Sequence, residues 1–367
     1  MSEHALTPRL AHLEPTAAQR VAMTISCRDA DHLPKVEGAG EVFLQSGALV
    51  QRMHNGVLIE EGCYYGPWMT EIIRALRGHH EPQEEVVFHE VLERLVATEP
   101  TASMIELGSF WAYYSMWFHQ RTQGNLIVAL EPDPNYLEVG RRNFALNGMN
   151  ATFLHGAVGD SPGQTVAFTA ESTGESVEVV QYDLASLMRE TGLHRVGLLM
   201  VDIQGFETSL IERAAELLSS GAIRFMIVST HHHVISGNAL THQRVLERLK
   251  GCGAHVIAEH TVGESYSGDG LIAVSFDERD RDMSVAISHA RAKESLFGEL
   301  EVDLQSAFNE LEELRALNSE LTARAVTAEQ NALNAHAQLD AVLRSRSWRS
   351  TRALRAATRL LPRRNGQ

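Results

Sequence analysis

Cysteine, lysine and long hydrophobic runs are all scarce in this sequence. Its three cysteines lie far apart in the 367 residues and in no metal-ligand spacing, so they indicate neither a disulfide framework nor a zinc finger. No apolar run approaches the roughly 20 residues that a membrane-spanning helix needs. The first residues lack the apolar core of a secretory signal. We therefore expect a globular protein in the reducing cytoplasm.

Positive charge is unevenly distributed. Lysine supplies only three of the 32 basic residues, and acidic residues outnumber basic ones to give a net charge of −15, which argues against general nucleic-acid binding. Eight arginines and no acidic residue lie between Arg344 and Gln367. The chain thus combines an acidic body with a basic tail.

Composition and hydrophobic patterning divide the chain into five segments. We expect a flexible N-terminal segment (1–40), an accessory region with a β-hairpin that recognises the acceptor (41–100), a domain of alternating strands and helices (101–280), a coiled coil (290–345) and a basic tail (346–367). The alternation in 101–280 is typical of an α/β protein with a mostly parallel sheet.

Within the α/β domain, solid apolar runs predict buried strands ending near residues 106, 130, 202 and 230, and a third strand beginning at Thr152. Two further runs around Gly268-Asp269-Gly270 predict an antiparallel last strand. Ligands of such sheets bind beyond the carboxyl ends of the strands. The residues that follow each strand are therefore the candidate site.

The turn after the first strand carries one glycine, Gly108. A dinucleotide-binding turn that began at Gly108 would also have glycines at positions 110 and 113, which let the backbone approach a pyrophosphate. This sequence has Phe110 and Tyr113 there instead. Glu131 lies where an acid accepts hydrogen bonds from ribose hydroxyls. S-adenosyl-L-methionine contains adenosine and a cationic sulfonium but no phosphate. Together with Glu106 and Asp202 at neighbouring strand ends, this pattern favours it as the cofactor and disfavours a nicotinamide-dependent reductase.

Several blocks of the sequence occur in a familiar order. ELGSFWAYYSMWF, EPDPNYLEVGRRNFALNG, GAVGD, YDLASL and VDIQGFE resemble the FkbM family of S-adenosylmethionine-dependent methyltransferases, over roughly residues 80–276. The resemblance implies a seven-stranded Rossmann-like sheet and O-methylation of hydroxyls, often on sugars or natural products. Gln204 departs from the acidic residue usual in the D-x-E-G-x-E block, which leaves its role in metal or acceptor binding open.

The predicted cofactor site comprises Glu106, Gly108, Ser109, Ser115, Glu131, Pro132, Ala157 and Asp202. Methyl transfer to a hydroxyl requires positioning and a proton acceptor. Asp202, His231 and His232 are the candidate catalytic residues, because carboxylates and neutral imidazoles accept protons near pH 7. Asp202, one histidine and Asp269 could instead bind a divalent metal, but their spacing forms no recognised motif, so we predict none.

The C-terminal segments suggest partners. Two heptad series beginning at Phe297 and Leu300 predict a coiled-coil homodimer or hetero-association; the alternative is a lone helix. Arginines spaced by three or four around Trp348 predict a basic amphipathic helix that contacts the inner face of an anionic membrane. A solubilising tail and docking onto an acidic partner are the alternatives. This tail also resembles S-x-S-W-R-x-T tails of bacterial proteins of surface-polysaccharide assembly.

Taken together, the sequence predicts an S-adenosylmethionine-dependent O-methyltransferase that modifies a hydroxyl of a glycan or glycosylated natural product. A methyltransferase-like scaffold that acts through its coiled coil without catalysis is the alternative.

Overall fold

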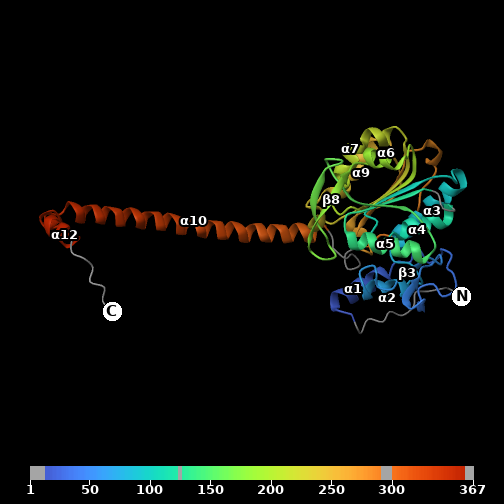
Figure 1. Cartoon of the computed structure of the whole chain (residues 1–367), viewed down its shortest axis with the longest axis horizontal. Helices are drawn as coiled ribbons and strands as arrows, with labels where there is room; N and C mark the ends of the chain where they lie inside the picture. Colours follow the sequence, from blue (N-terminus) through green and yellow to red (C-terminus); the bar gives the residue numbers. More distant parts are fainter. Residues whose placement is uncertain (1–12, 123–125, 291–299, 360–367) are drawn as a thin grey trace. The chain divides into compact units, whose positions relative to one another are not determined.

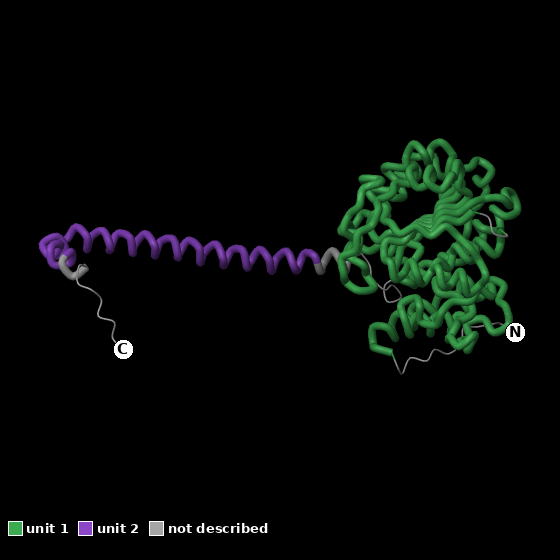
Figure 2. Tube along the Cα trace, in the orientation of Figure 1, with its two compact units in different colours: residues 1–299 green, residues 300–367 purple. Residues whose placement is uncertain are grey.

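The computed structural model describes residues 13–122, 126–290 and 300–359. The chain divides into two compact units, residues 1–299 and 300–367 (Figure 2). The first contains the N-terminal region and the α/β domain. The second is helical.

The larger unit is built on a nine-stranded sheet of order β11-β12-β10-β9-β4-β5-β6-β8-β7. The strands are β4 (Met104–Leu107), β5 (Ile127–Glu131), β6 (Thr152–Val158), β7 (Thr165–Thr169), β8 (Ser176–Tyr182), β9 (Val196–Val201), β10 (Ile223–Thr230), β11 (His255–His260) and β12 (Gly270–Ser275). The predicted Rossmann-like α/β class is confirmed. So is the antiparallel last strand, because β12 runs antiparallel to β10 and β11. The expected count of seven strands is exceeded by β7 and β8.

Helices cover both faces of the sheet (Figure 1). On one face lie α3 (Pro82–Thr98), α4 (Tyr113–Thr122) and α5 (Pro134–Leu146); on the other lie α6 (Leu184–Thr191), α7 (Glu207–Ser219) and α9 (Thr241–Gly251). Every residue of β4, β5, β9 and β10 is buried, which explains their unbroken apolar character. Covering both faces leaves the strand ends as the exposed rim of the sheet.

The N-terminal region folds onto this domain. Strands β1 (Val42–Gln45), β2 (Ala48–Arg52) and β3 (Leu58–Glu60) form an antiparallel sheet that contains the predicted hairpin. The side-chain oxygens of Asn147 and Asn143 on α5 accept hydrogen bonds from the backbone N–H groups of Leu58 and Glu60, at 2.9 and 3.0 Å. These bonds fix the accessory region against the α/β domain.

The expectation of a flexible segment over residues 1–40 does not hold from residue 13 onward. Helix α1 (Pro15–Thr24) begins with a proline at its first turn, packs against α2 (Pro67–Ala75) and buries Val21 completely. Residues 1–12 lie outside the described residues. Sparse hydrophobic residues concealed this helix, because only one of its faces is apolar.

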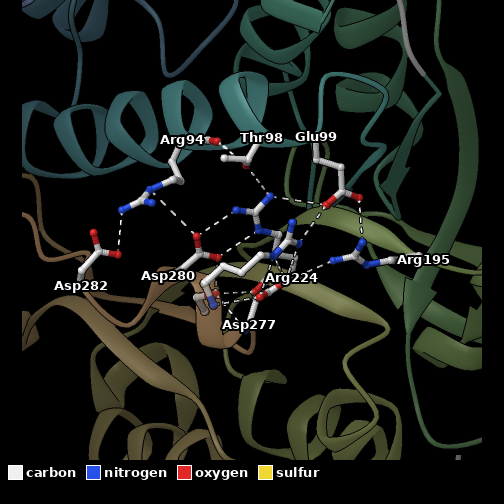
Figure 3. Close-up of polar contacts among 10 residues, drawn as sticks. Arg94, Thr98, Glu99, Arg195, Arg224, Asp277, Asp280 and Asp282 are labelled. Carbon is white, nitrogen blue, oxygen red and sulfur yellow. Dashed lines mark hydrogen bonds and ion pairs between the residues drawn. The ribbon is translucent and has the colours of Figure 1, made fainter.

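A buried ion pair lies near the start of β10 (Figure 3). The guanidinium of Arg224 donates two hydrogen bonds to the carboxylate of Asp280, at 3.0 and 2.8 Å, and both side chains are fully buried. Thr98 and Glu99, at the end of α3, accept further bonds from it. Bidentate pairing of this kind satisfies the charge that burial would otherwise make costly.

The second unit consists of α10 (Leu300–Arg344), α11 (Arg346–Ser350) and α12 (Arg352–Arg359). Large apolar side chains of the two heptad series are exposed, from 40% at Leu311 to 56% at Leu314. Phe297, the first residue of one series, lies outside the described residues. Within the ranges given above, no helix is both long and apolar enough to cross a membrane.

Candidate active site

A cavity of about 500 Å³ opens at the carboxyl ends of the central strands. Glu106 lies on β4, Glu131 at the end of β5 and Ala157 on β6, while Asp202 directly follows β9; all four line the cavity. Parallel register between β4 and its neighbours brings these residues to one edge of the sheet. The site thus lies at the rim that the sequence indicated.

The turn after β4 has the shape that a phosphate-free ligand permits. Gly108 has a φ of 77°, and a Cβ atom there would lie 1.7 Å from the carbonyl oxygen of Asp202, so only glycine fits. Phe110 also adopts a positive φ, of 38°, and its ring stacks on Tyr136 at a centroid distance of 3.5 Å. The stacked rings of Phe110 and Tyr136 therefore occupy the place where the backbone of a dinucleotide-binding turn would approach a pyrophosphate.

The acids at the ends of β4 and β5 are buried and held by backbone N–H groups. Glu131 accepts hydrogen bonds from the N–H groups of Phe110 and Asp133, both at 2.9 Å, and Glu106 accepts one from Ser115 at 3.2 Å. Burial raises the pKa of Glu106 to about 8 and that of Glu131 to about 7, although these bonds favour the ionised forms. Both carboxylates are consequently poised for a cationic or hydrogen-bonding ligand.

Acidic side chains dominate the lining of this cavity. Seven carboxylates line it, and its described lining contains no lysine or arginine: the acids are Glu81, Glu84, Glu106, Glu131, Asp133, Glu171 and Asp202. Such an environment attracts a positive charge and repels phosphate. Its apolar walls suit a flat aromatic base.

A second cavity of about 380 Å³ adjoins the first. Asp202 is one of the residues that line both cavities, together with Tyr64, Tyr65 and Glu81. The remaining walls of the second come from α1, α2, the segment after β10 and the loop before β12; they include Arg20, Trp68, His231 and Asp269. The two adjoining cavities therefore share Asp202 in their walls.

A histidine between carboxylates supports Asp202. His231 Nε2 lies 3.0 Å from Asp202 Oδ1, and its Nδ1 lies 2.8 Å from Glu207 Oε1. Asp269 Oδ1 lies 3.9 Å from Nε2. Burial opposes the charge on His231, but the carboxylates of Asp269, Asp202 and Glu207 outweigh it and raise its pKa well above the ordinary value. The three carboxylates therefore favour the charged form of the ring.

These neighbours change the role expected for His231. The sequence-based interpretation used a neutral imidazole as a proton acceptor, whereas both ring nitrogens of the buried His231 lie beside carboxylates. Its position favours orienting Asp202. The alternative metal site has its members close together, since His231 Nε2 lies 3.0 Å from Asp202 and 3.9 Å from Asp269.

The other predicted residues separate into three groups. The first cavity is lined by most of the predicted cofactor residues: Glu106, Gly108, Ser109, Glu131, Pro132, Ala157 and Asp202. Ser115 lies behind it and supports Glu106. His232 lines neither cavity; it caps the short helix α8 (His233–Ser236), its Nδ1 accepting a bond from Val234 N–H at 3.3 Å. Placing His232 in the site is thus not supported.

Sequence reasoning missed several lining residues. His80, Glu81 and Glu84 come from the start of α3, and residues 166–169 come from the unpredicted strand β7. Glu207, which contacts His231, stood in the VDIQGFE block but had no assigned role. Gln204 lines both cavities, so the position that departs from the family pattern does face the site.

Comparison with known proteins supports a methyltransferase domain. Residues 96–256 match the family model described as the Methyltransferase FkbM domain. No curated protein sequence matches the chain.

Three solved structures are similar to part of the chain. One is WbdD, with 14% identity, coverage of 52% of this chain and 39% of that chain, and a TM-score of 0.36. Another is the precorrin-6y C5,15-methyltransferase from Geobacter metallireducens GS-15, with 16% identity, coverage of 53% of this chain and 88% of that chain, and a TM-score of 0.34. The third is the N-terminal domain of human METTL16 in complex with SAH, with 12% identity, coverage of 54% of this chain and 71% of that chain, and a TM-score of 0.35. The chain spans less than half the length of WbdD.

Proposed function

We propose that this protein is an S-adenosylmethionine-dependent O-methyltransferase that acts on a hydroxyl of a glycan or glycosylated natural product. The observation that carries the proposal is an acid-lined, lysine- and arginine-free cavity at the carboxyl edge of the sheet, within the segment that matches a methyltransferase domain. A cationic, phosphate-free adenosine compound has the complementary chemistry.

The residues present fit this cofactor. Glu131 would accept hydrogen bonds from the ribose hydroxyls, because it is buried at the end of β5 and fixed by two backbone N–H groups. Glu106 and Asp202 would attract the cationic groups, and Phe110 stacked on Tyr136 would supply apolar surface for the base. When bound, the cofactor supplies an activated methyl group.

The chain's own residues would then position the acceptor and take its proton. Asp202 lines both cavities, and its side chain is 43% exposed, so it can reach a hydroxyl in the second cavity. His231 and Glu207 are positioning residues that hold the carboxylate. Enclosure by Tyr64 and Tyr65 would keep water from competing with the acceptor.

The second cavity suits a sugar-sized acceptor. The rings of Tyr65 and Trp68 stack at 5.8 Å, and the guanidinium of Arg20 lies 5.5 Å from the Trp68 ring. Aromatic faces pack against the apolar C–H faces of sugars, while the neighbouring carboxylates and Gln204 can bind hydroxyls. This mixture favours a neutral polyhydroxylated acceptor over an acidic one.

Titration calorimetry with S-adenosylmethionine and S-adenosylhomocysteine tests the cofactor, and labelled methyl transfer to nucleotide sugars, lipid-linked glycans and polyols tests the reaction. We expect binding of both compounds and labelling of at least one class. Binding without labelling would favour the alternative scaffold function. Loss of both would overturn the assignment.

We further propose that α10 mediates self-association or binds another helix, because Leu314 and Leu321 expose apolar surface along one heptad series. Leu314→Asn combined with Leu321→Asn should reduce the sedimenting mass of the full chain. An unchanged mass would contradict the proposal.

The tail would direct a cytoplasmic protein to the inner face of an anionic membrane, since α11 and α12 carry arginines around Trp348. Co-sedimentation with phosphatidylserine vesicles should be lost when those arginines become glutamine. Equal binding by the two proteins would contradict this role.

A further inference from the structure

A second cluster of chemically reactive side chains lies apart from Asp202. His54 follows β2, His79 precedes α3 and Glu85 lies in the first turn of α3. All three are buried, with at most 2% of each residue exposed. One ligand atom of each lies within 4.8 Å of those of the other two. Segments 25 residues apart in the chain thus converge on one point.

Three of the four imidazole nitrogens of this cluster lack a hydrogen-bond partner in the described part of the chain, and the fourth, Nδ1 of His79, contacts the carboxylate of Glu85. Among the described residues, none forms a hydrogen bond with Nδ1 or Nε2 of His54 or with Nε2 of His79. His54 is packed edge-to-face against His79 and Trp117, at 4.1 and 4.3 Å. Each buried polar atom without a partner costs about 1–3 kcal/mol. Three of them at one place require a compensating interaction.

We propose that His54, His79 and Glu85 bind a divalent transition-metal ion, with Zn²⁺ as the preferred ion. Two imidazole nitrogens and one carboxylate oxygen are a donor set that zinc commonly takes. The ion would bind one nitrogen of His54, neither of which has a partner among the described residues, and would lie beside His79 and Glu85, which already contact each other. It would also connect the loop after β2 to the start of α3.

The site would act on the active-site wall through structure. Glu85 Oε1 accepts a hydrogen bond from the backbone N–H of His80 at 2.8 Å, and the His80 ring lines both cavities. It packs edge-on against Trp111 at 4.8 Å. Fixing Glu85 would therefore fix His80 and the Trp111 ring, with no part in methyl transfer.

Elemental analysis of the full-length protein, purified without an immobilised-metal column, is the first test. We expect about one zinc per chain. His54→Leu keeps a side chain of similar volume but removes both nitrogens, and should lose the metal. His194→Leu, at an exposed histidine, is the matched control and should retain it.

Thermal unfolding provides the second measurement. After chelation, ZnCl₂ should raise the Tm of the wild type and of His194→Leu but not that of His54→Leu. The proposal would be overturned if the wild type contained no metal and its Tm did not change with ZnCl₂. It would also be overturned if His54→Leu kept the metal or showed the same ZnCl₂-induced rise in Tm as the wild type. Should His54→Leu fail to fold, the wild-type metal content and zinc response decide. S-adenosylhomocysteine binding, measured in parallel, tests the proposed function separately.

Discussion

Two clusters of buried charge in the α/β domain are balanced in different ways. Near the start of β10, Arg224 is fully buried but pairs with Asp280 at 2.8 and 3.0 Å (Figure 3). In the acid-lined cavity at the carboxyl ends of the central strands, Glu106 and Glu131 accept backbone hydrogen bonds but face no lysine or arginine of the described lining.

The difference separates structural charge from functional charge. At the Arg224 cluster, the protein supplies both signs, so the pair is complete without a ligand. At the cavity, the pKa of Glu106 is raised to about 8 and that of Glu131 to about 7, because burial is not offset by a cation. Buried acids that lack a counter-charge from the protein are candidates for binding one from outside.

The largest expected effect comes from removing the carboxylate of Asp202, which lines both cavities. Asp202→Asn keeps the shape of the side chain but removes the proton acceptor, so kcat for methyl transfer should fall about 10²–10⁴-fold. Initial rates with labelled S-adenosylmethionine measure this. Affinity for S-adenosylhomocysteine should change far less. Asp160→Asn, on the surface beside Arg213, is the control, and near-normal kcat in Asp202→Asn would remove Asp202 from proton transfer.

Breaking the balanced cluster should cost stability instead of activity. Arg224→Met leaves the buried carboxylate of Asp280 with only the Ser275 hydroxyl and the distant Arg94 Nε, 4.0 Å away, so the free energy of unfolding should fall by about 3–5 kcal/mol. Urea denaturation measures it. Replacing both partners, as Arg224→Met with Asp280→Leu, should recover much of the loss, while Arg213→Met at an exposed pair should cost at most about 1 kcal/mol. Equal losses at the buried and exposed pairs would contradict the comparison.

The core of the fold was predictable because parallel strands that are buried on both faces consist of consecutive apolar residues. The predicted runs GLLMVD (197–202) and IRFMIVST (223–230) became β9 and β10, with ends within a residue of expectation. Strands β7 and β8 were missed because exposed polar and half-buried residues alternate along much of their length, so their sequence resembles a surface loop.

The candidate site was predictable only where it follows strand ends. Glu106, Glu131 and Asp202 were found by that rule. Tyr64 and Tyr65 lie in the predicted accessory region, but nothing local to the sequence places them over a strand end tens of residues away. His232 lines neither cavity, because β10 ends at Thr230 and the chain turns into α8.

A smaller effect is expected from removing the charge of one acid in the acid-lined cavity. Glu131→Gln retains the volume but weakens the hydrogen bonds to a ribose, so S-adenosylhomocysteine should bind about 10–150-fold more weakly, equivalent to about 1.5–3 kcal/mol. Calorimetry compares it with Glu138→Gln, which lies on the exposed face of α5. Equal affinity of both variants would place the ribose elsewhere.

The smallest expected effect is the pH dependence of stability that the buried acids of the cavity, which lack a counter-charge in its described lining, should produce. A carboxyl whose folded pKa is raised destabilises the free protein as pH rises from its unfolded value, near 4.5, to the folded one. Ionisation of Glu131 and Glu106 should therefore lower the stability of the ligand-free protein up to about pH 7 and about pH 8 respectively.

A cationic ligand reverses this trend, because it binds the ionised carboxylates and releases their protons. Between pH 6 and 8, affinity for S-adenosylmethionine should rise by at most about tenfold per pH unit for each proton released. Affinity for S-adenosylhomocysteine, whose sulfur is neutral, should rise less. Calorimetry in buffers of different ionisation enthalpy counts the protons. Parallel pH profiles for the two compounds would show that the cavity senses the adenosine alone, and that its acids do not recognise the sulfonium charge.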